Sequence, residues 1–291
     1  MKPKDLESFK IWFTDYVSEY LTDDSDYNYA IRLKEDHTHR VCRNIALLGK
    51  ELNLSDQDML LAETMALFHD IGRFKQYERY RTFNDSRSEN HADLGLTEIA
   101  GQAVLSVCTQ QERYLITNAI AFHNAVALPE DRDDKALFFM RLLRDADKLD
   151  IWKVFCDYYH KRQTQPDAGP NATIELGLPD KPACSPDVIG ALQEGRFARV
   201  EDLRTLNDFK LLQISWVFDL NFIPSFQALQ RRRHIEQIAA TLPQTGEIPE
   251  VVKRAHEHIN TFSKQTGSLN SAVFPVTAGR SLCNNISKRN N

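Results

Sequence analysis

Apolar residues recur every three or four positions through the first half of the chain, a spacing that predicts helices rather than strands. One stripe advances by steps of 4, 4, 3 and 4 and consists of His37, Val41, Ile45, Leu48 and Leu52. Ser55, with Asp58 three positions later, is typical of a helix start. Further helices are expected over residues 91–105, 112–122 and 134–155. No alternating pattern competes with them, so we expect an all-α fold.

The helical pattern is interrupted between Gln163 and Pro186 by prolines and glycines, which a continuous helix does not accommodate. Helices are expected again over residues 187–242 and 249–264. The chain is therefore divided into an N-terminal helix packed on the core (1–29), a helical core (30–160), a loop or lid (161–186), a C-terminal helical extension (187–265) and a loosely ordered tail (266–291).

Charge and cysteine usage exclude several classes of protein. The chain has 36 Lys and Arg against 41 Asp and Glu, a net charge of −5, which gives no general attraction to nucleic acid or anionic membranes. Its five cysteines lie far apart without a CxxC pair, which argues against a disulfide framework and a zinc–thiolate site. The N-terminus lacks the uninterrupted apolar stretch of a signal peptide. We expect a cytoplasmic protein.

Strong metal-ligating side chains occupy the apolar faces of these helices. They are His37, His69, Asp70, His123 and Asp147. A single buried histidine is more often a hydrogen-bonded core residue. Several inward-facing His and Asp side chains are different, because buried charge must be paired or bound to metal. The pattern therefore indicates a metal site.

These residues resemble the motif of the HD-domain superfamily of metal-dependent phosphohydrolases. His37 lies in Asp-His-Thr-His-Arg, His69 and Asp70 form the doublet of Phe-His-Asp-Ile-Gly-Arg, and Asp147 lies in Ala-Asp-Lys-Leu, 77 residues later (147 − 70). The family pattern selects Asp147 over its neighbours Asp145 and Asp150. The resemblance covers roughly residues 30–160 and implies a helical bundle carrying the loop and the extension.

His91 and His123 are similar to the additional histidines of the HD branch that binds two metals. In that branch Asp70 would bridge the ions. The resemblance implies one ion held by His37, His69, Asp70 and Asp147, and a second held with His91 and His123.

The ligand types predict the chemistry. Imidazole with carboxylate suits Mn, Fe, Co, Ni or Zn better than Mg. Water between two ions becomes a nucleophile near neutral pH, and phosphorus is its natural target. Arg73 and Lys148, beside the ligands, are expected to bind the phosphate and to share the catalytic role with Asp70. Arg87 and Asn90 are weaker candidates for substrate binding.

The favoured function is hydrolysis of a phosphate mono- or diester of a nucleotide or another small phosphorylated molecule, with no nucleic-acid or membrane partner. The absence of a Gly-Tyr-Pro motif disfavours the cyclic-dinucleotide phosphodiesterases of this superfamily. Two alternatives stay open: a mixed-valence di-iron oxygenase using the same ligands, and a non-catalytic signalling module. A later aromatic cluster is interpreted as core packing, with pocket lining as the alternative: Trp216, Phe218, Phe222 and Phe226. No motif addresses the substrate, the native metal or the oligomeric state.

Overall fold

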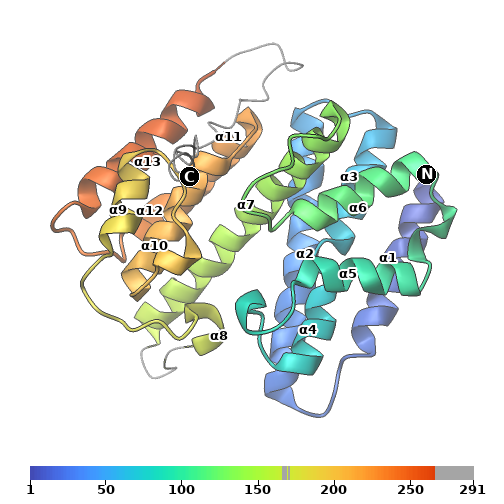
Figure 1. Ribbon diagram of the computed structural model, residues 1–291, viewed down its shortest axis with the longest axis horizontal. Coiled ribbons are helices and arrows are strands. Elements are labelled where there is room, and N and C mark those ends of the chain that lie inside the picture. Colours follow the sequence, from blue (N-terminus) through green and yellow to red (C-terminus); the bar gives the residue numbers. More distant parts are fainter. Residues whose placement is uncertain (166–168, 170, 266–291) are drawn as a thin grey trace, which may run out of the picture.

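The computed structural model describes residues 1–165, 169 and 171–265, and its regular structure is helical (Figure 1). No strand occurs within these residues, which confirms the predicted all-α class. The tail predicted for residues 266–291 lies outside the described part of the chain.

The first part of the chain forms seven helices and two short 3-10 turns. They are α1 (Pro3–Ser18), α2 (Ser25–Glu51), α3 (Asp56–Phe68), α4 (Gly72–Tyr80), η1 (Asp85–Arg87), α5 (His91–Gly101), η2 (Val104–Val107), α6 (Gln110–Phe122) and α7 (Asp134–Thr164). The second part also consists of helices and 3-10 turns. They are α8 (Ala172–Glu175), α9 (Pro186–Gln193), η4 (Val200–Asp202), α10 (Leu206–Ser215), η5 (Trp216–Asp219), α11 (Ile223–Arg232), α12 (His234–Ala239) and α13 (Ile248–Ser263).

Side-chain caps explain where several helices begin. The Ser55 hydroxyl accepts a hydrogen bond from the Asp58 amide, as predicted for the start of α3. Thr109 and Glu112 form a reciprocal capping box, so the helix predicted from residue 112 begins two residues earlier. The helix predicted over residues 91–105 ends at Gly101 because the backbone turns left-handed at Ala103 (φ 51°).

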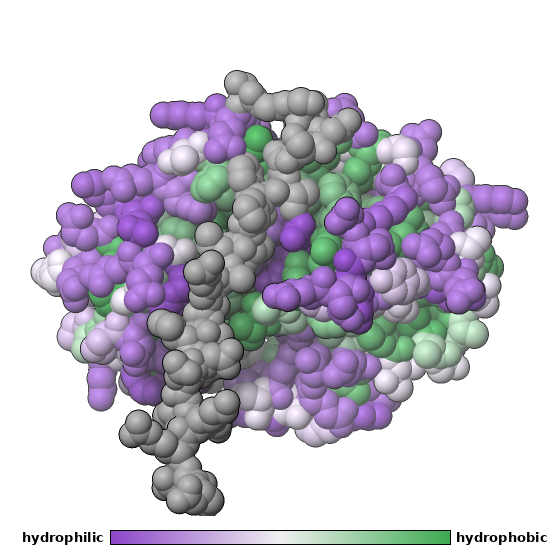
Figure 2. Space-filling view, turned by 45° about the horizontal axis from the view of Figure 1, so that its top comes forward, coloured by the Kyte–Doolittle hydropathy of each residue, from purple (hydrophilic) through white to green (hydrophobic). Residues whose placement is uncertain are grey.

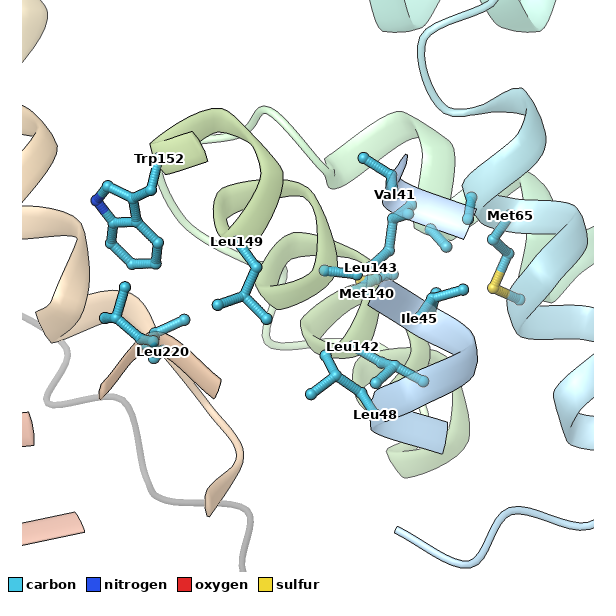
Figure 3. Close-up of a cluster of buried hydrophobic side chains, with 14 of the residues drawn as sticks. Val41, Ile45, Leu48, Met65, Met140, Leu142, Leu143, Leu149, Trp152 and Leu220 are labelled. Carbon is cyan, nitrogen blue, oxygen red and sulfur yellow. The ribbon is translucent and has the colours of Figure 1, made fainter. Parts of the chain in front are cut away.

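The helix α7 is the central element of the fold, with α1–α6 gathered at one end of the molecule and α9–α13 at the other (Figure 1). It packs against α2, α3 and α6 on one side and against α11 and α12 on the other. Figure 3 shows these two interfaces: Met140 and Leu143 lie beside Val41 and Ile45 of α2, whereas Leu149 and Trp152 lie toward Leu220. The helix α7 also runs nine residues beyond the predicted end at Phe155 (164 − 155).

The extension is less continuous than its sequence pattern predicts. Residues 187–242 form four helices and two 3-10 turns rather than long helices. Pro224 lies in the first turn of α11, where its missing N–H is tolerated, and a left-handed residue, Arg233 (φ 56°), ends that helix.

The surface is predominantly polar. Figure 2 shows one face of the molecule, on which hydrophilic residues predominate and hydrophobic residues form smaller patches between them. Within the described residues, the helices are too short or too polar to cross a lipid bilayer.

Candidate metal centre

Elements from across the first part of the fold bring the six predicted ligands to one place. His37 comes from the middle of α2, His69 and Asp70 from the α3–α4 turn, His91 from the first residue of α5, His123 from the end of α6 and Asp147 from the middle of α7. All six side chains are buried or nearly so, as the apolar registers predict for five of them; His91 was predicted from the family resemblance alone.

The His-Asp doublet lies in a tight turn, because α3 ends at Phe68 instead of continuing through Asp70. The turn leads into Gly72, where α4 approaches α5 closely. A Cβ atom built on Gly72 would lie 2.1 Å from the His91 carbonyl oxygen and 2.4 Å from the Gly95 amide nitrogen. Only glycine permits this approach, which places His91 beside Asp70.

Backbone carbonyls fix the tautomer of two histidines. Nδ1 of His69 lies 2.7 Å from the carbonyl oxygen of Ala66, and Nδ1 of His123 lies 2.7 Å from that of Ile120. A carbonyl oxygen only accepts, so each Nδ1 carries the proton. The lone pair of each ring is therefore on Nε2, which faces the centre of the cluster.

Carboxylates orient the other two histidines in the same way. Nδ1 of His37 donates to Asp150 over 2.6 Å, and Nδ1 of His91 donates to Asp85 over 2.7 Å. Neither carboxylate is among the residues predicted from the sequence. Asp150 could have been found from its position three residues after Asp147, one turn along the same helix, whereas Asp85 lies on a loop that carries no such signal.

The four Nε2 atoms form two close pairs. Those of His37 and His69 are 3.3 Å apart, and those of His91 and His123 are 2.9 Å apart. Two facing lone pairs at this distance repel unless a cation or a proton lies between them. Donor atoms about 2.1 Å from a shared transition-metal ion lie about 3 Å apart when their bonds are at right angles. Both pairs fit that geometry.

Asp70 lies between the two pairs and presents one oxygen to each. Its Oδ2 is 3.5 Å from Nε2 of His37 and 3.7 Å from that of His69. Its Oδ1 is 3.3 Å from Nε2 of His91 and 3.8 Å from that of His123. A carboxylate in this position can serve two ions at once.

Asp147 lies beside the first pair only. Its Oδ1 is 3.0 Å from Nε2 of His37 and 3.7 Å from that of His69, and it is buried without a hydrogen-bond donor. A buried anionic oxygen without a donor requires a cation. This geometry agrees with the family resemblance, which implies that Asp147 holds the same ion as His37 and His69.

The electrostatics favour the ligand forms of His91 and Asp70. Burial and the charge of Arg73 lower the pKa of His91 to about 3, so its imidazole is neutral at pH 7. Burial alone would raise the pKa of Asp70, but the charges of nearby cations, Lys34 first and then Arg73, outweigh it and hold this pKa well below its usual value. Neutral imidazole and ionised carboxylate are the forms that bind metal.

Two groups of side chains can therefore hold a metal ion, and they share Asp70. One consists of His37, His69 and Asp70, the other of Asp70, His91 and His123, and within each group the ligand atoms lie within 4.8 Å of one another. Imidazole and carboxylate donors fit divalent transition metals.

The comparison with known families agrees with this geometry. The HD domain family matches residues 35–152. Residues 35–152 form an HD domain. The match contains all six of these side chains and ends within α7. HD-domain proteins generally bind divalent metals. No curated protein and no solved structure matched the chain.

Two cationic side chains border the cluster of the HD domain. Arg73, predicted to bind phosphate, lines the adjoining cavity, and its Nη1 also bonds Asp85 and the Phe83 carbonyl. Lys34 lies on the same cavity with its Nζ 2.9 Å from Oδ2 of Asp70. Lys34 is not among the residues predicted from the sequence, although it precedes His37 by three residues on α2 and so shares its face.

Lys148, the other predicted phosphate ligand, also lines the cavity but is paired with the extension. Its Nζ lies 2.6 Å from Oδ2 of Asp219, which Arg144 also contacts at 2.7 Å. Arg144 donates further hydrogen bonds to the carbonyls of residues 122, 123 and 125, at the end of α6. Asp219 therefore connects the extension to the part of the HD domain that carries His123.

Neither Arg87 nor Asn90 lines this cavity. Arg87 is exposed in η1. Asn90 caps α5 by accepting a hydrogen bond from the Ala92 amide, and it also accepts one from Asn124, which lines the cavity beside His91. The role of both residues in substrate binding stays a prediction.

We expect Asp219→Asn to lower the free energy of unfolding by about 3 kcal/mol, because it leaves Arg144 and Lys148 buried without an anion. Burial raises the pKa of Asp219, but these two cations outweigh it and keep the carboxylate ionised. Denaturant unfolding measures the change. The matched control, Asp157→Asn, removes an exposed partner of Lys153 on α7 and should leave the midpoint unchanged. Equal stability of both variants would contradict the role given to Asp219.

Proposed function

We propose that the protein is a metal-dependent phosphohydrolase that cleaves a phosphate mono- or diester of a small molecule and holds two ions. The position of Asp70, with one oxygen facing each histidine pair, carries the proposal. Membership of residues 35–152 in the HD domain family supports it, since the family suggests metal-dependent hydrolysis.

In this proposal, the ions would supply a water activated as a nucleophile and would draw charge from a phosphoryl oxygen. The side chains that would hold the ions are His37, His69, His91, His123, Asp70 and Asp147. Lys34 and Arg73 bind the remaining phosphoryl oxygens, because they are the cations on the cavity wall nearest Asp70. Asp85 and Asp150 keep two imidazole rings oriented.

We also propose a division of roles along the chain. Residues 30–160 supply the catalytic core, and residues 161–186 and 187–265 shape access to it. The cavity beside the cluster supports this for the extension, because Phe197, Leu212 and Trp216 line it.

Elemental analysis of the purified protein, followed by assays of phosphate release with Mn, Co, Ni, Fe, Zn and Mg, tests the proposal. We expect about two transition-metal ions per chain, and hydrolysis of a phosphate ester that stops after chelation and returns with metal. Bound metal without phosphate release from monoesters, diesters or nucleotides would refute the hydrolase. Iron-dependent oxygen uptake in its place would identify the oxygenase.

A further inference from the structure

The cavity beside the metal cluster is lined by both charged and apolar side chains. It has a volume of about 550 Å³ and lies between the HD domain and the extension. This size is in the range of sites that enclose a small molecule rather than a single inorganic ion. The phosphate of a substrate would lie at the metal cluster, so the apolar part of the lining is available to the rest of the molecule.

The apolar part of the lining comes largely from the extension. Its walls are formed by Ile151 of α7, Phe197, Leu212 of α10 and Trp216. The Trp216 ring is held by two aromatic neighbours, with centroids 6.3 Å from those of Trp152 and Phe155. A ring fixed in this way offers a rigid apolar surface to a ligand.

Two exposed valines continue this apolar surface to the mouth of the cavity. Val126, in the loop before α7, is 71% exposed, and Val200, in η4, is 62% exposed. They come from opposite sides, one from the HD domain and one from the extension. Exposed apolar side chains gathered at a cavity mouth mark a surface that a ligand covers.

The lining offers few side-chain amides that could hydrogen-bond the edge of a nucleobase. Among the described lining residues the only side-chain amide is that of Asn124, and it lies near the metal cluster, 3.3 Å from Asp85. Among the charged groups of the lining, Lys148 is paired with Asp219, whereas Arg199 and Glu201 are exposed and lie 3.8 Å apart. A site that reads a base needs unshared donors and acceptors placed at its edges.

We infer that the substrate is a phosphate ester of an apolar alcohol, preferably one carrying an aromatic ring, and that Trp216 and Phe197 select it. The inference rests on the proposed hydrolase and names its substrate class. In the reaction, the water oxygen bonds to phosphorus, and the bond from phosphorus to the alcohol oxygen breaks. That oxygen takes up a proton, and the products are the free alcohol and inorganic phosphate.

The test compares three monoesters of primary alcohols with similar leaving groups: phenylpropyl phosphate, glycerol phosphate and adenosine monophosphate. With the Mn-loaded protein, we expect kcat/KM for the phenylpropyl ester to exceed the other two by about 10-fold or more, from burial of the ring. Equal values, or preference for the nucleotide, would overturn the inference while leaving the hydrolase intact.

Variants then locate the selectivity. Trp216→Ala should raise KM for phenylpropyl phosphate by about 10-fold with a smaller change in kcat, and Trp216→Phe should restore most of the loss. Since Trp216→Ala also removes packing, Val126→Ser with Val200→Ser provides a second test at exposed positions. Val107→Ser, at an equally exposed valine (60%) outside the cavity, is the matched control and should change nothing.

Calorimetric titration with phenylpropylphosphonate and methylphosphonate, which are not hydrolysed, separates the inference from the hydrolase. Tighter binding of the phenylpropyl compound, lost in Trp216→Ala, supports the apolar site even if no ester is cleaved. Equal affinity for the two compounds in the folded, metal-loaded protein would refute it.

Discussion

Asp70→Ala is expected to abolish metal binding and phosphate-ester hydrolysis together. The variant removes the oxygen that faces His37 and His69 and the oxygen that faces His91 and His123, so both groups lose an anionic ligand. It also leaves Lys34 and Arg73 beside the site without the anion that they share. Their uncompensated positive charge then repels an incoming cation. We expect the metal content to fall from about two ions to near none and kcat/KM to fall by about 1,000-fold or more.

Elemental analysis and phosphate release measure both effects, with circular dichroism to verify that the variant is folded. The matched control is Asp56→Ala, which removes an exposed carboxylate at the far end of α3. His91→Ala affects only one of the two groups, so it should keep the ion held by His37 and His69. Full turnover of Asp70→Ala at unchanged metal content would exclude a shared carboxylate.

Gly72→Ala is expected to destabilise the protein by about 3 kcal/mol or more and to weaken metal binding as well. The new Cβ would lie 2.1 Å from the His91 carbonyl oxygen and 2.4 Å from the Gly95 amide nitrogen. Both are backbone atoms and no rotamer change can relieve the contact, so α4 and α5 must separate. The separation moves His91 away from Asp70.

Thermal unfolding and elemental analysis measure these two effects. Gly101→Ala is the control on α5, since nothing lies within 4 Å of the Cβ position there and alanine favours the helix. It should keep or slightly raise the unfolding temperature. Similar unfolding temperatures for the two variants would show that the contact between α4 and α5 is looser than described.

The fold class could be predicted from the sequence because the residues that recur at helical spacing are the residues that the structure buries. The steps from His37 to Leu48 predict a buried face on α2, and the structure has Val41, Ile45 and Leu48 fully buried. Helix ends are harder to predict, since they depend on contacts remote in sequence. The helix α3 ends at Phe68, just before the point where Gly72 packs closely against Gly95. No sequence pattern near Phe68 indicates that contact.

For the site, the sequence predicts the ligand types better than their surroundings. Inward-facing His and Asp residues are recognisable because charged side chains seldom occupy apolar registers. Asp85 bonds His91 from an irregular loop, where no periodicity gives its direction. The sequence leaves core packing and pocket lining open for the aromatic cluster, and only the tertiary structure separates them: Trp216 lines the cavity, whereas Phe222 and Phe226 are buried in the core.

The shared helix α7 also limits how this protein can change over evolution. The family match ends at Trp152, in the middle of a 31-residue helix about 46 Å long. The indole of that residue is fully buried and donates to the carbonyl of Gln213 in α10 over 2.8 Å. The HD domain and the extension therefore cannot be separated at the end of the family match. Truncation there would split a helix and leave an unpacked tryptophan. New substrate preferences are expected to arise by point substitution in the shared cavity rather than by domain exchange.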